Sequence, residues 1–159
     1  MRRPLGRRSN LKYMINIAVS NLNKKHRINE RFVEDIARRV LKILKRENAE
    51  LEIIFLSDAA IRPVNSKYKR SNRATDVLSF DLGSCLEILI SSDMALRNSR
   101  IFNTPFEKEL VLYVIHGILH LFGYDDEDPK AGSKMFRKQD SILEILCANI
   151  GLSKVLTRR

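Results

Sequence analysis

The sequence predicts a single α+β domain, in which a small mixed β-sheet of about four strands packs with about five helices. Three observations support this fold class. The 159 residues fit one domain. No repeat, low-complexity tract or Gly/Ser-rich linker divides them. Strand-like segments are flanked by helical segments instead of strictly alternating with them. A chain of this length can bury a core without metal or disulfide support.

The first half of the chain contains two predicted helices around a predicted strand. Asn29 can cap a helix in which apolar residues recur at helical spacing over 32–44. The apolar run 51–56 is typical of a buried strand. Ser57 can then start a short helix, in which we expect a distortion at Pro63 because a proline removes one backbone donor.

Two further strands and two long helices follow. The segments 77–80 and 86–90 predict strands joined by a turn at Gly83. Thr104 and the following proline then predict the start of a helix over 105–122, which Gly123 ends.

The last predicted helix begins at Asp128-Pro129 and stops near Gly151. Its apolar residues should face the core, and they are Met135, Phe136, Ile142, Ile145, Leu146 and Ile150.

Several protein classes are excluded by composition. Cys85 and Cys147 stand in apolar contexts, so we expect two core residues and no disulfide scaffold. No apolar run approaches the ~20 residues that span a bilayer. The apolar stretch 13–19 is short and interrupted by Asn16, so no signal peptide is expected. These features predict a cytoplasmic protein without membrane partners.

Charge points to a polyanionic partner. The chain has 29 Lys and Arg against 19 Asp and Glu, a net charge of +10. Residues 1–12 form a basic arm without acids, and a second acid-free cluster spans 62–73, whereas four acids gather at 125–128. Separation of this kind favours a phosphate-binding surface beside an acidic or metal site, although a solvated basic surface would show the same excess.

The strongest chemical signal is a pair of histidines. His116 and His120 are four residues apart on the apolar helix, so both imidazoles share one face and can reach one metal ion. A third ligand could come from any acid in 125–128. In the zinc signature His-x-x-x-His-x-x-Gly-x-x-His, Gly123 has the position of the glycine and Asp126 that of the third histidine. The general-base glutamate of zinc peptidases is replaced by Gly117, which weakens a peptidase interpretation.

Two long segments then identify a resemblance. The segment His-Gly-Ile-Leu-His-Leu-Phe-Gly-Tyr-Asp at 116–125 resembles the signature of the YbeY family of bacterial endoribonucleases for rRNA maturation. The segments Asn-Ser-Lys-Tyr-Lys at 65–69 and Thr-Asp-Val-Leu-Ser-Phe at 75–80 are similar to a second block of that family. The likeness covers roughly residues 50–147.

The resemblance implies a metal-dependent hydrolase that cleaves single-stranded RNA in the maturation of small-subunit (16S) rRNA and in ribosome quality control. The implied partners are RNA, the small ribosomal subunit and its assembly factors. His116 and His120 carry over as ligands of one divalent ion, with Zn²⁺ as the default and Mn²⁺ or Fe²⁺ as alternatives. The resemblance also implies a catalytic role for His116.

Two positions depart from the family pattern. Asp126 replaces the third histidine, and Lys69 replaces an arginine that would contact phosphate. Lys69 is therefore expected to serve in both catalysis and substrate binding, and Arg70 and Arg73 in substrate binding. These departures motivate an alternative, a non-catalytic RNA- or ribosome-binding assembly factor with a degenerate metal site.

Four other positions are expected to have structural roles. His26 stands among basic residues and is expected at the surface, and Tyr124 is expected to pack beneath the turn. Thr75 and Asp76 could line the cleft, but a strand cap is preferred for both.

Overall fold

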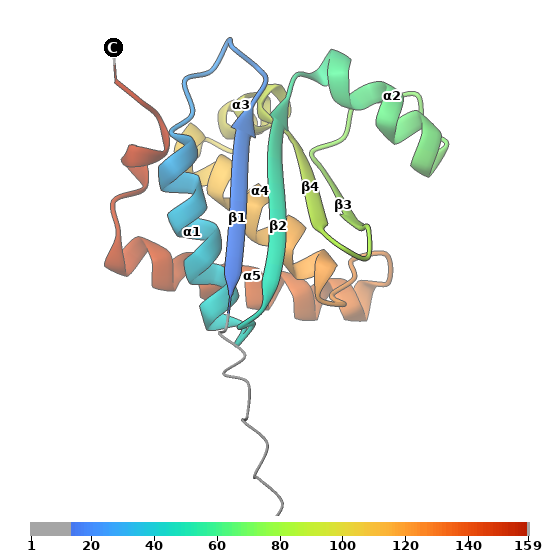
Figure 1. Ribbon diagram of the computed structural model, residues 1–159. Helices are drawn as coiled ribbons and strands as arrows, with labels where there is room; N and C mark the ends of the chain where they lie inside the picture. The colour runs from blue at the N-terminus through green and yellow to red at the C-terminus, as the bar shows by residue number, and fades with distance from the viewer. Residues whose placement is uncertain (1–13, 159) are drawn as a thin grey trace, which may run out of the picture.

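The protein is described by a computed structural model over residues 14–158, in which four strands and five α-helices form one α+β domain (Figure 1). The α+β class is confirmed. The elements are β1 Ile15–Asn21, α1 Glu30–Ile43, β2 Ala49–Leu56, α2 Asp58–Lys69, β3 Val77–Asp81, β4 Leu86–Ser91, α3 Ser92–Ile101, α4 Phe106–Leu121, α5 Pro129–Asn149 and a 3₁₀ turn, Leu152–Val155. The predicted basic arm 1–12 lies outside the described residues.

The sheet is mixed and has the strand order β1-β2-β4-β3. β1, β2 and β4 are parallel, while β3 pairs antiparallel with β4, with Leu78 opposite Leu89. β3 is thus an edge strand, and its residues 77–81 lie beside the helix that carries the histidine pair. The turn between β3 and β4 contains Gly83 at φ +84°, a conformation that glycine adopts without a steric cost.

The main core lies between the sheet and the helices α1, α4 and α5 (Figure 1). Side chains such as Ile36, Phe55, Ile88 and Ile115 are fully buried in it. A smaller cluster of Ile61, Leu78 and Leu89 packs α2 against the other face of the sheet. Both faces are therefore covered, and α4 is held in the middle of the fold.

The predicted helix starts are confirmed at three of four positions. The side chains of Asn29, Ser57 and Asp128 accept hydrogen bonds from backbone N–H groups in the first turns of α1, α2 and α5. The prediction for Thr104 is wrong. The N-cap of α4 is Pro105, and the Thr104 hydroxyl instead donates to the Glu109 carboxylate (2.7 Å).

Some burial predictions are also wrong. Phe136 and Ile145 on α5 are exposed, and Leu143 takes a core position that was not predicted. Cys147 is exposed and Cys85 only half-buried. Helical spacing predicts the central part of the apolar face of α5 correctly. It overestimates the width of this face, because Phe136 and Ile145 lie outside the core. Across the described part of the chain, every helix falls short of the length or the apolarity needed to cross a bilayer.

Candidate metal centre

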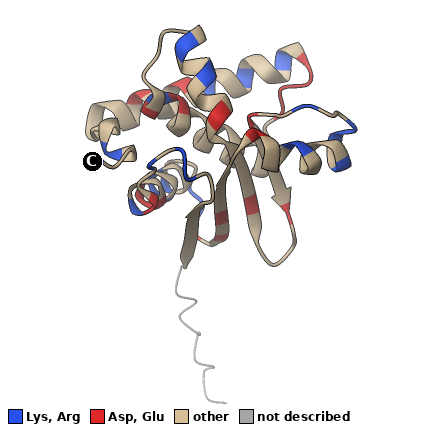
Figure 2. Ribbon diagram, turned by 90° about the horizontal axis from the view of Figure 1, so that it is seen from above, with Lys and Arg blue, Asp and Glu red and all other residues tan. Residues whose placement is uncertain are grey.

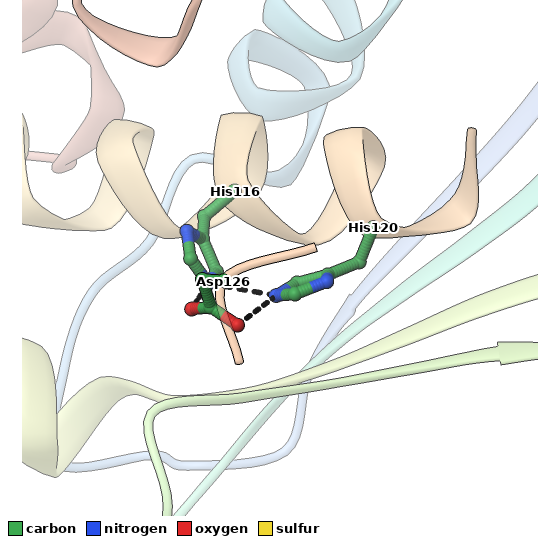
Figure 3. A group of neighbouring side chains, drawn as sticks. All are labelled: His116, His120 and Asp126. Carbon is green, nitrogen blue, oxygen red and sulfur yellow. Dashed lines mark hydrogen bonds and ion pairs between the residues drawn. The ribbon is translucent and has the colours of Figure 1, made fainter. Parts of the chain in front are cut away.

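Two histidines and one aspartate meet at the C-terminal half of α4 (Figure 3). The Nε2 atoms of His116 and His120 are 3.0 Å apart. The Asp126 carboxylate approaches both, with Oδ2 at 3.4 Å from His116 Nε2 and Oδ1 at 3.6 Å from His120 Nε2. The structure therefore brings the three predicted ligands together, although Asp126 lies in the turn beyond the helix.

The position of α4 depends on Gly117. A Cβ atom at this residue would lie 2.7 Å from a methyl carbon of Ile88 on β4 and 3.1 Å from one of Val77 on β3. The Gly117 carbonyl also accepts a hydrogen bond from the Ser79 hydroxyl on β3 (2.9 Å). The helix therefore lies close against the sheet, and no side chain fits at the position where zinc peptidases carry their glutamate.

The turn after α4 returns the chain to the histidines. Gly123 has φ +91°, which ends the helix as predicted, and Tyr124 N–H then donates to the Leu119 carbonyl (3.1 Å). Asp125 Oδ1 accepts from Glu127 N–H (3.1 Å), so Asp125 stabilises the turn. Asp126, between them, has its carboxylate facing the two imidazoles (Figure 3).

The outer nitrogens of both histidines have partners that fix the tautomers. His120 Nδ1 lies 3.1 Å from the Tyr124 carbonyl, which can only accept, so this nitrogen carries the proton. His116 Nδ1 lies 2.8 Å from Gln139 Oε1 on α5, which is likewise an acceptor. With Nδ1 as the proton-bearing nitrogen, each ring in its neutral form turns an Nε2 lone pair toward the other ring and toward the Asp126 carboxylate. The three side chains therefore direct metal-ligating atoms at one another.

This donor set fits a divalent cation. Imidazole nitrogen and carboxylate oxygen bind zinc at about 2.0–2.2 Å, and separations of 3.0–3.6 Å are compatible with ligands that share one ion. Hydrogen bonds from ligand histidines to outer acceptors are usual at such sites. Burial, and then the neighbouring His116, lower the pKa of His120, which favours the neutral form that a metal requires.

Two cavities open beside this group. The smaller, about 230 Å³, reaches His116 and His120 from the α5 side and is also lined by Gln139 and Phe136. The larger, about 500 Å³, follows the edge strand β3 and the turn 125–127. Four residues line both cavities, and they are Lys69, Val77, His120 and Asp126.

The predicted basic residues are placed unequally. Lys69 lines both cavities, whereas Arg70 and Arg73 are exposed in the loop after α2 and line neither. Figure 2 shows basic residues on α2 and the loop that follows it, and also on other helices. Asn65 Nδ2 donates to the Arg73 carbonyl (2.8 Å), which ties this loop to α2.

Two residues near the candidate metal centre were not predicted to belong to it from the sequence, Gln139 and, in part, Asp76. Gln139 is a buried polar residue at helical spacing from Met135 and Leu143, an interruption of the apolar face that could have indicated a functional contact. Asp76 Oδ1 accepts from Val77 N–H (2.7 Å), which is the preferred strand cap, and the residue also lines the smaller cavity. Tyr124 is half-buried against the core, as expected.

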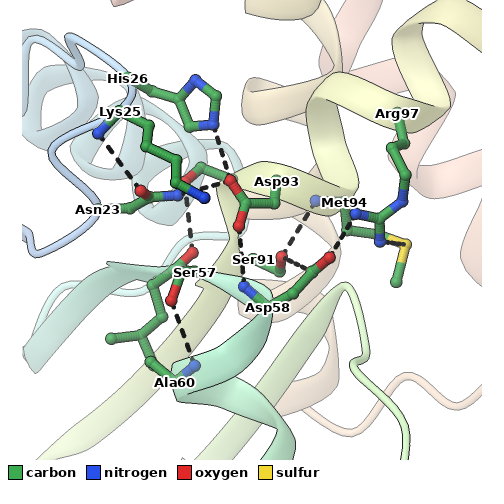
Figure 4. Close-up of polar contacts among 12 residues, drawn as sticks. Asn23, Lys25, His26, Ser57, Asp58, Ala60, Ser91, Asp93, Met94 and Arg97 are labelled. Atoms are coloured by element: carbon green, nitrogen blue, oxygen red, sulfur yellow. Dashed lines mark hydrogen bonds and ion pairs between the residues drawn. The ribbon is translucent and has the colours of Figure 1, made fainter.

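A second histidine–aspartate cluster lies near the carboxyl ends of the parallel strands (Figure 4). His26 is not a simple surface residue, because its side chain is 12% exposed and its Nε2 lies 3.0 Å from Asp93 Oδ1. The same oxygen accepts from Asn23 Nδ2 (2.9 Å), and Asp93 Oδ2 accepts from Asp58 N–H (3.0 Å). Both oxygens of the Asp93 carboxylate therefore have hydrogen-bond donors.

Comparisons with known proteins agree with the geometry. The family described as Endoribonuclease YbeY matches residues 18–147. Relatives of that name include one from Thermotoga maritima, 37% identical over 72% of this chain and 80% of its own, and one from Bdellovibrio bacteriovorus, 36% identical over 69% and 77%. A solution structure from Thermotoga maritima has a TM-score of 0.60 and 33% identity, covering 83% of this chain and 89% of that one. The chain therefore belongs to the YbeY endoribonuclease family of metal-dependent hydrolases.

Proposed function

We propose that this protein is a metal-dependent endoribonuclease that cleaves single-stranded RNA in the maturation of small-subunit rRNA and in ribosome quality control, in the cytoplasm. Family membership supports the reaction class. The observation that carries the proposal is the set of three acceptors, His116, His120 and Asp126, that face one another beside two cavities.

The three acceptors would hold one divalent ion, with zinc as the default and manganese or iron also compatible with a carboxylate ligand. A divalent ion bound there would polarise a phosphoryl oxygen and make water a better nucleophile near neutral pH. His116 and His120 would bind the ion through Nε2, because the Nδ1 atom of each ring faces an acceptor, Gln139 or Tyr124. These contacts hold the two rings in the orientation that the ion needs.

Lys69 is the side chain that would contact the RNA backbone at the site, because it lines both cavities. As a point charge it can bind one phosphate oxygen, without the planar two-oxygen contact of an arginine. Arg70 and Arg73 would attract phosphates farther along the strand from their exposed loop. The proposed partners are accordingly single-stranded rRNA and the small ribosomal subunit with its assembly factors.

Metal analysis of the purified protein, combined with cleavage of single-stranded RNA with and without a chelator, tests the proposal. We expect about one divalent ion per chain and cleavage that chelation abolishes. A non-catalytic assembly factor would bind RNA and sediment with ribosomes after chelation, and would show no cleavage at any metal concentration. The peptidase alternative has little support, because the side chains of Ile88 and Val77 lie too close to Gly117 for a glutamate at that position.

The basic loop predicts a strong salt dependence of RNA binding, because neutralised phosphates release counterions. Changing Lys69, Arg70 and Arg73 together to alanine should weaken binding and reduce the slope of log affinity against log salt by about 2–3. Titrations at several salt concentrations measure this slope. An unchanged slope would remove this loop from the RNA-binding surface.

A further inference from the structure

Two exposed aromatic side chains flank the candidate metal centre. Tyr68 at the end of α2 is 60% exposed and lines the larger cavity. Phe136 on α5 is 48% exposed and lines the smaller one. Burying an aromatic ring is favourable, and these two rings remain largely in water. An exposed ring on each of two adjoining cavities therefore suits a ligand with flat apolar faces, which would cover both rings.

The ring of Tyr68 is supported by a residue of the sheet. It packs on Phe80 of β3 with ring centroids 4.7 Å apart and planes tilted by 54°. Phe80 in turn packs on the small cluster that joins α2 to the sheet. The Lys67 ammonium lies over the Tyr68 ring, 5.7 Å from its centroid, and adds positive charge there. Tyr68 is therefore a supported, exposed ring with a cation on a flexible side chain near its face, which a phosphate or base could displace.

Phe136 is positioned from the opposite side. Its neighbour Met135 is fully buried and fixes the helix, while the Phe136 ring faces outward. The ring lies nearly parallel to His116, with centroids 6.4 Å apart and an interplanar angle of 25°. It therefore extends the wall of the smaller cavity from the histidine pair toward solvent.

The two cavities share the metal-centre wall. Lys69, His120 and Asp126 line both, so the candidate site lies between the two aromatic surfaces. A strand of RNA that crosses this wall would place one phosphate at Lys69 and direct the adjacent bases to opposite sides. Cavities of about 230 and 500 Å³ are of the order of size that accommodates small ligands or parts of them.

We propose that Tyr68 and Phe136 each stack one nucleobase, so that the two nucleotides joined by the scissile phosphate are spread over the metal centre. This proposal rests on the endoribonuclease function proposed above and specifies how that site holds its substrate. Aromatic side chains stack any base, because every base has a π face. Bases of a duplex are already stacked and paired, so this arrangement selects single strands.

The test uses metal-loaded protein and a short single-stranded RNA in which 2-aminopurine replaces one base at a time. Its fluorescence falls on stacking and is read by stopped flow before cleavage. We expect quenching at the two nucleotides flanking the cleaved bond. Tyr68→Ala should remove it at one position and Phe136→Ala at the other, and each should bind RNA about ten-fold more weakly.

Matched variants separate stacking from general damage. Tyr68→Phe and Phe136→Tyr keep an aromatic ring and should behave like the parent. Phe102→Ala removes a phenylalanine that is even more exposed, 66% at the end of α3, and should change neither quenching nor binding. Metal content should stay at the parental level in every variant, because none of these residues belongs to the candidate ligand set.

The outcomes distinguish this proposal from the one on which it rests. If the parent binds and cleaves RNA while Tyr68→Ala and Phe136→Ala quench and bind as it does, base stacking is overturned and the endoribonuclease function stands. If the parent binds no single-stranded RNA, the proposed function itself fails. Quenching that Phe102→Ala also removes would contradict the assignment to Tyr68 and Phe136.

Discussion

Two clusters in this molecule combine histidine with aspartate, and they differ in how donors and acceptors are matched. In the cluster of His26 and Asp93, the carboxylate accepts from an imidazole, an amide and a backbone N–H (Figure 4). In the cluster of His116, His120 and Asp126, the outer imidazole protons bind Gln139 and Tyr124, and three acceptors face inward.

Both oxygens of the Asp93 carboxylate accept hydrogen bonds, whereas the second cluster is a candidate metal site. Residue types alone do not distinguish them, since both contain histidine beside aspartate. The difference lies in which nitrogen carries the proton and what the other nitrogen faces. We therefore expect variants in the first cluster to affect stability, and variants in the candidate metal centre to affect metal binding and cleavage.

The largest expected effect is the loss of metal and activity in His116→Ala. Removing one of three ligands should abolish detectable metal binding and RNA cleavage, while the apo protein keeps a cooperative thermal transition, because the core consists of apolar packing. Elemental analysis, a cleavage assay and a melt measure these quantities together. Loss of the cooperative melt would make the metal structural.

Asp126→Ala should lower metal affinity by at least the 10–100-fold that loss of an outer partner costs. Asp126→His should retain zinc, because it restores a third imidazole. The suitable control is Glu127→Ala, since Asp125 holds the turn and Asp128 caps α5. Metal titrations with a competing chelator give the affinities. Parental affinity in Asp126→Ala would show that this residue is no ligand.

In the other cluster, Asp93→Ala should destabilise the fold and leave metal binding intact. The change removes the acceptor shared by three donors, on His26, Asn23 and Asp58, in a largely buried location, and of these Asn23 keeps a second hydrogen bond to the Ser92 hydroxyl. We expect a loss of about 2–4 kcal/mol in the free energy of unfolding. Urea denaturation gives this value, and elemental analysis shows that metal content stays at the parental level. A parental unfolding midpoint would contradict the structural assignment.

The smallest expected effect is a pH dependence of stability from Asp93. Burial by itself would raise the pKa of Asp93, but hydrogen bonds from Asp58 N–H, Asn23 and His26 outweigh it and lower the pKa below its ordinary value. A carboxyl group whose pKa is lower in the folded state stabilises the protein above the unfolded pKa of about 3.9. This stability should be lost as pH falls through the folded value.

Urea midpoints between pH 5 and pH 2 measure this dependence. In Asp93→Asn the fall in midpoint should be shallower, because the titrating carboxyl group is gone. Equal slopes in parent and variant would show that other carboxyl groups account for acid unfolding.

Local patterns in the sequence determined much of the fold. Asn29, Ser57 and Asp128 start helices because their side chains satisfy N–H groups in the first turn, and Gly83 and Gly123 turn the chain because they tolerate positive φ. Similarly, the spacing of His116 and His120, one helical turn apart, predicts two of the three candidate metal ligands. These features depend on a few neighbouring residues, so they can be read from the chain alone.

Tertiary structure decided the rest. β1 and α3 carry no long apolar pattern, and β1 forms by pairing with β2. The edge position of β3, the contact of Gln139 with His116 and the distinction between His26 and the histidine pair all involve residues distant in sequence. Asp126 became the facing carboxylate among four neighbouring acids because the turn points only this one at the imidazoles. The direction in which a side chain points, and the distant residues that it contacts, are set by the packing of the whole fold. Local sequence patterns do not encode that packing.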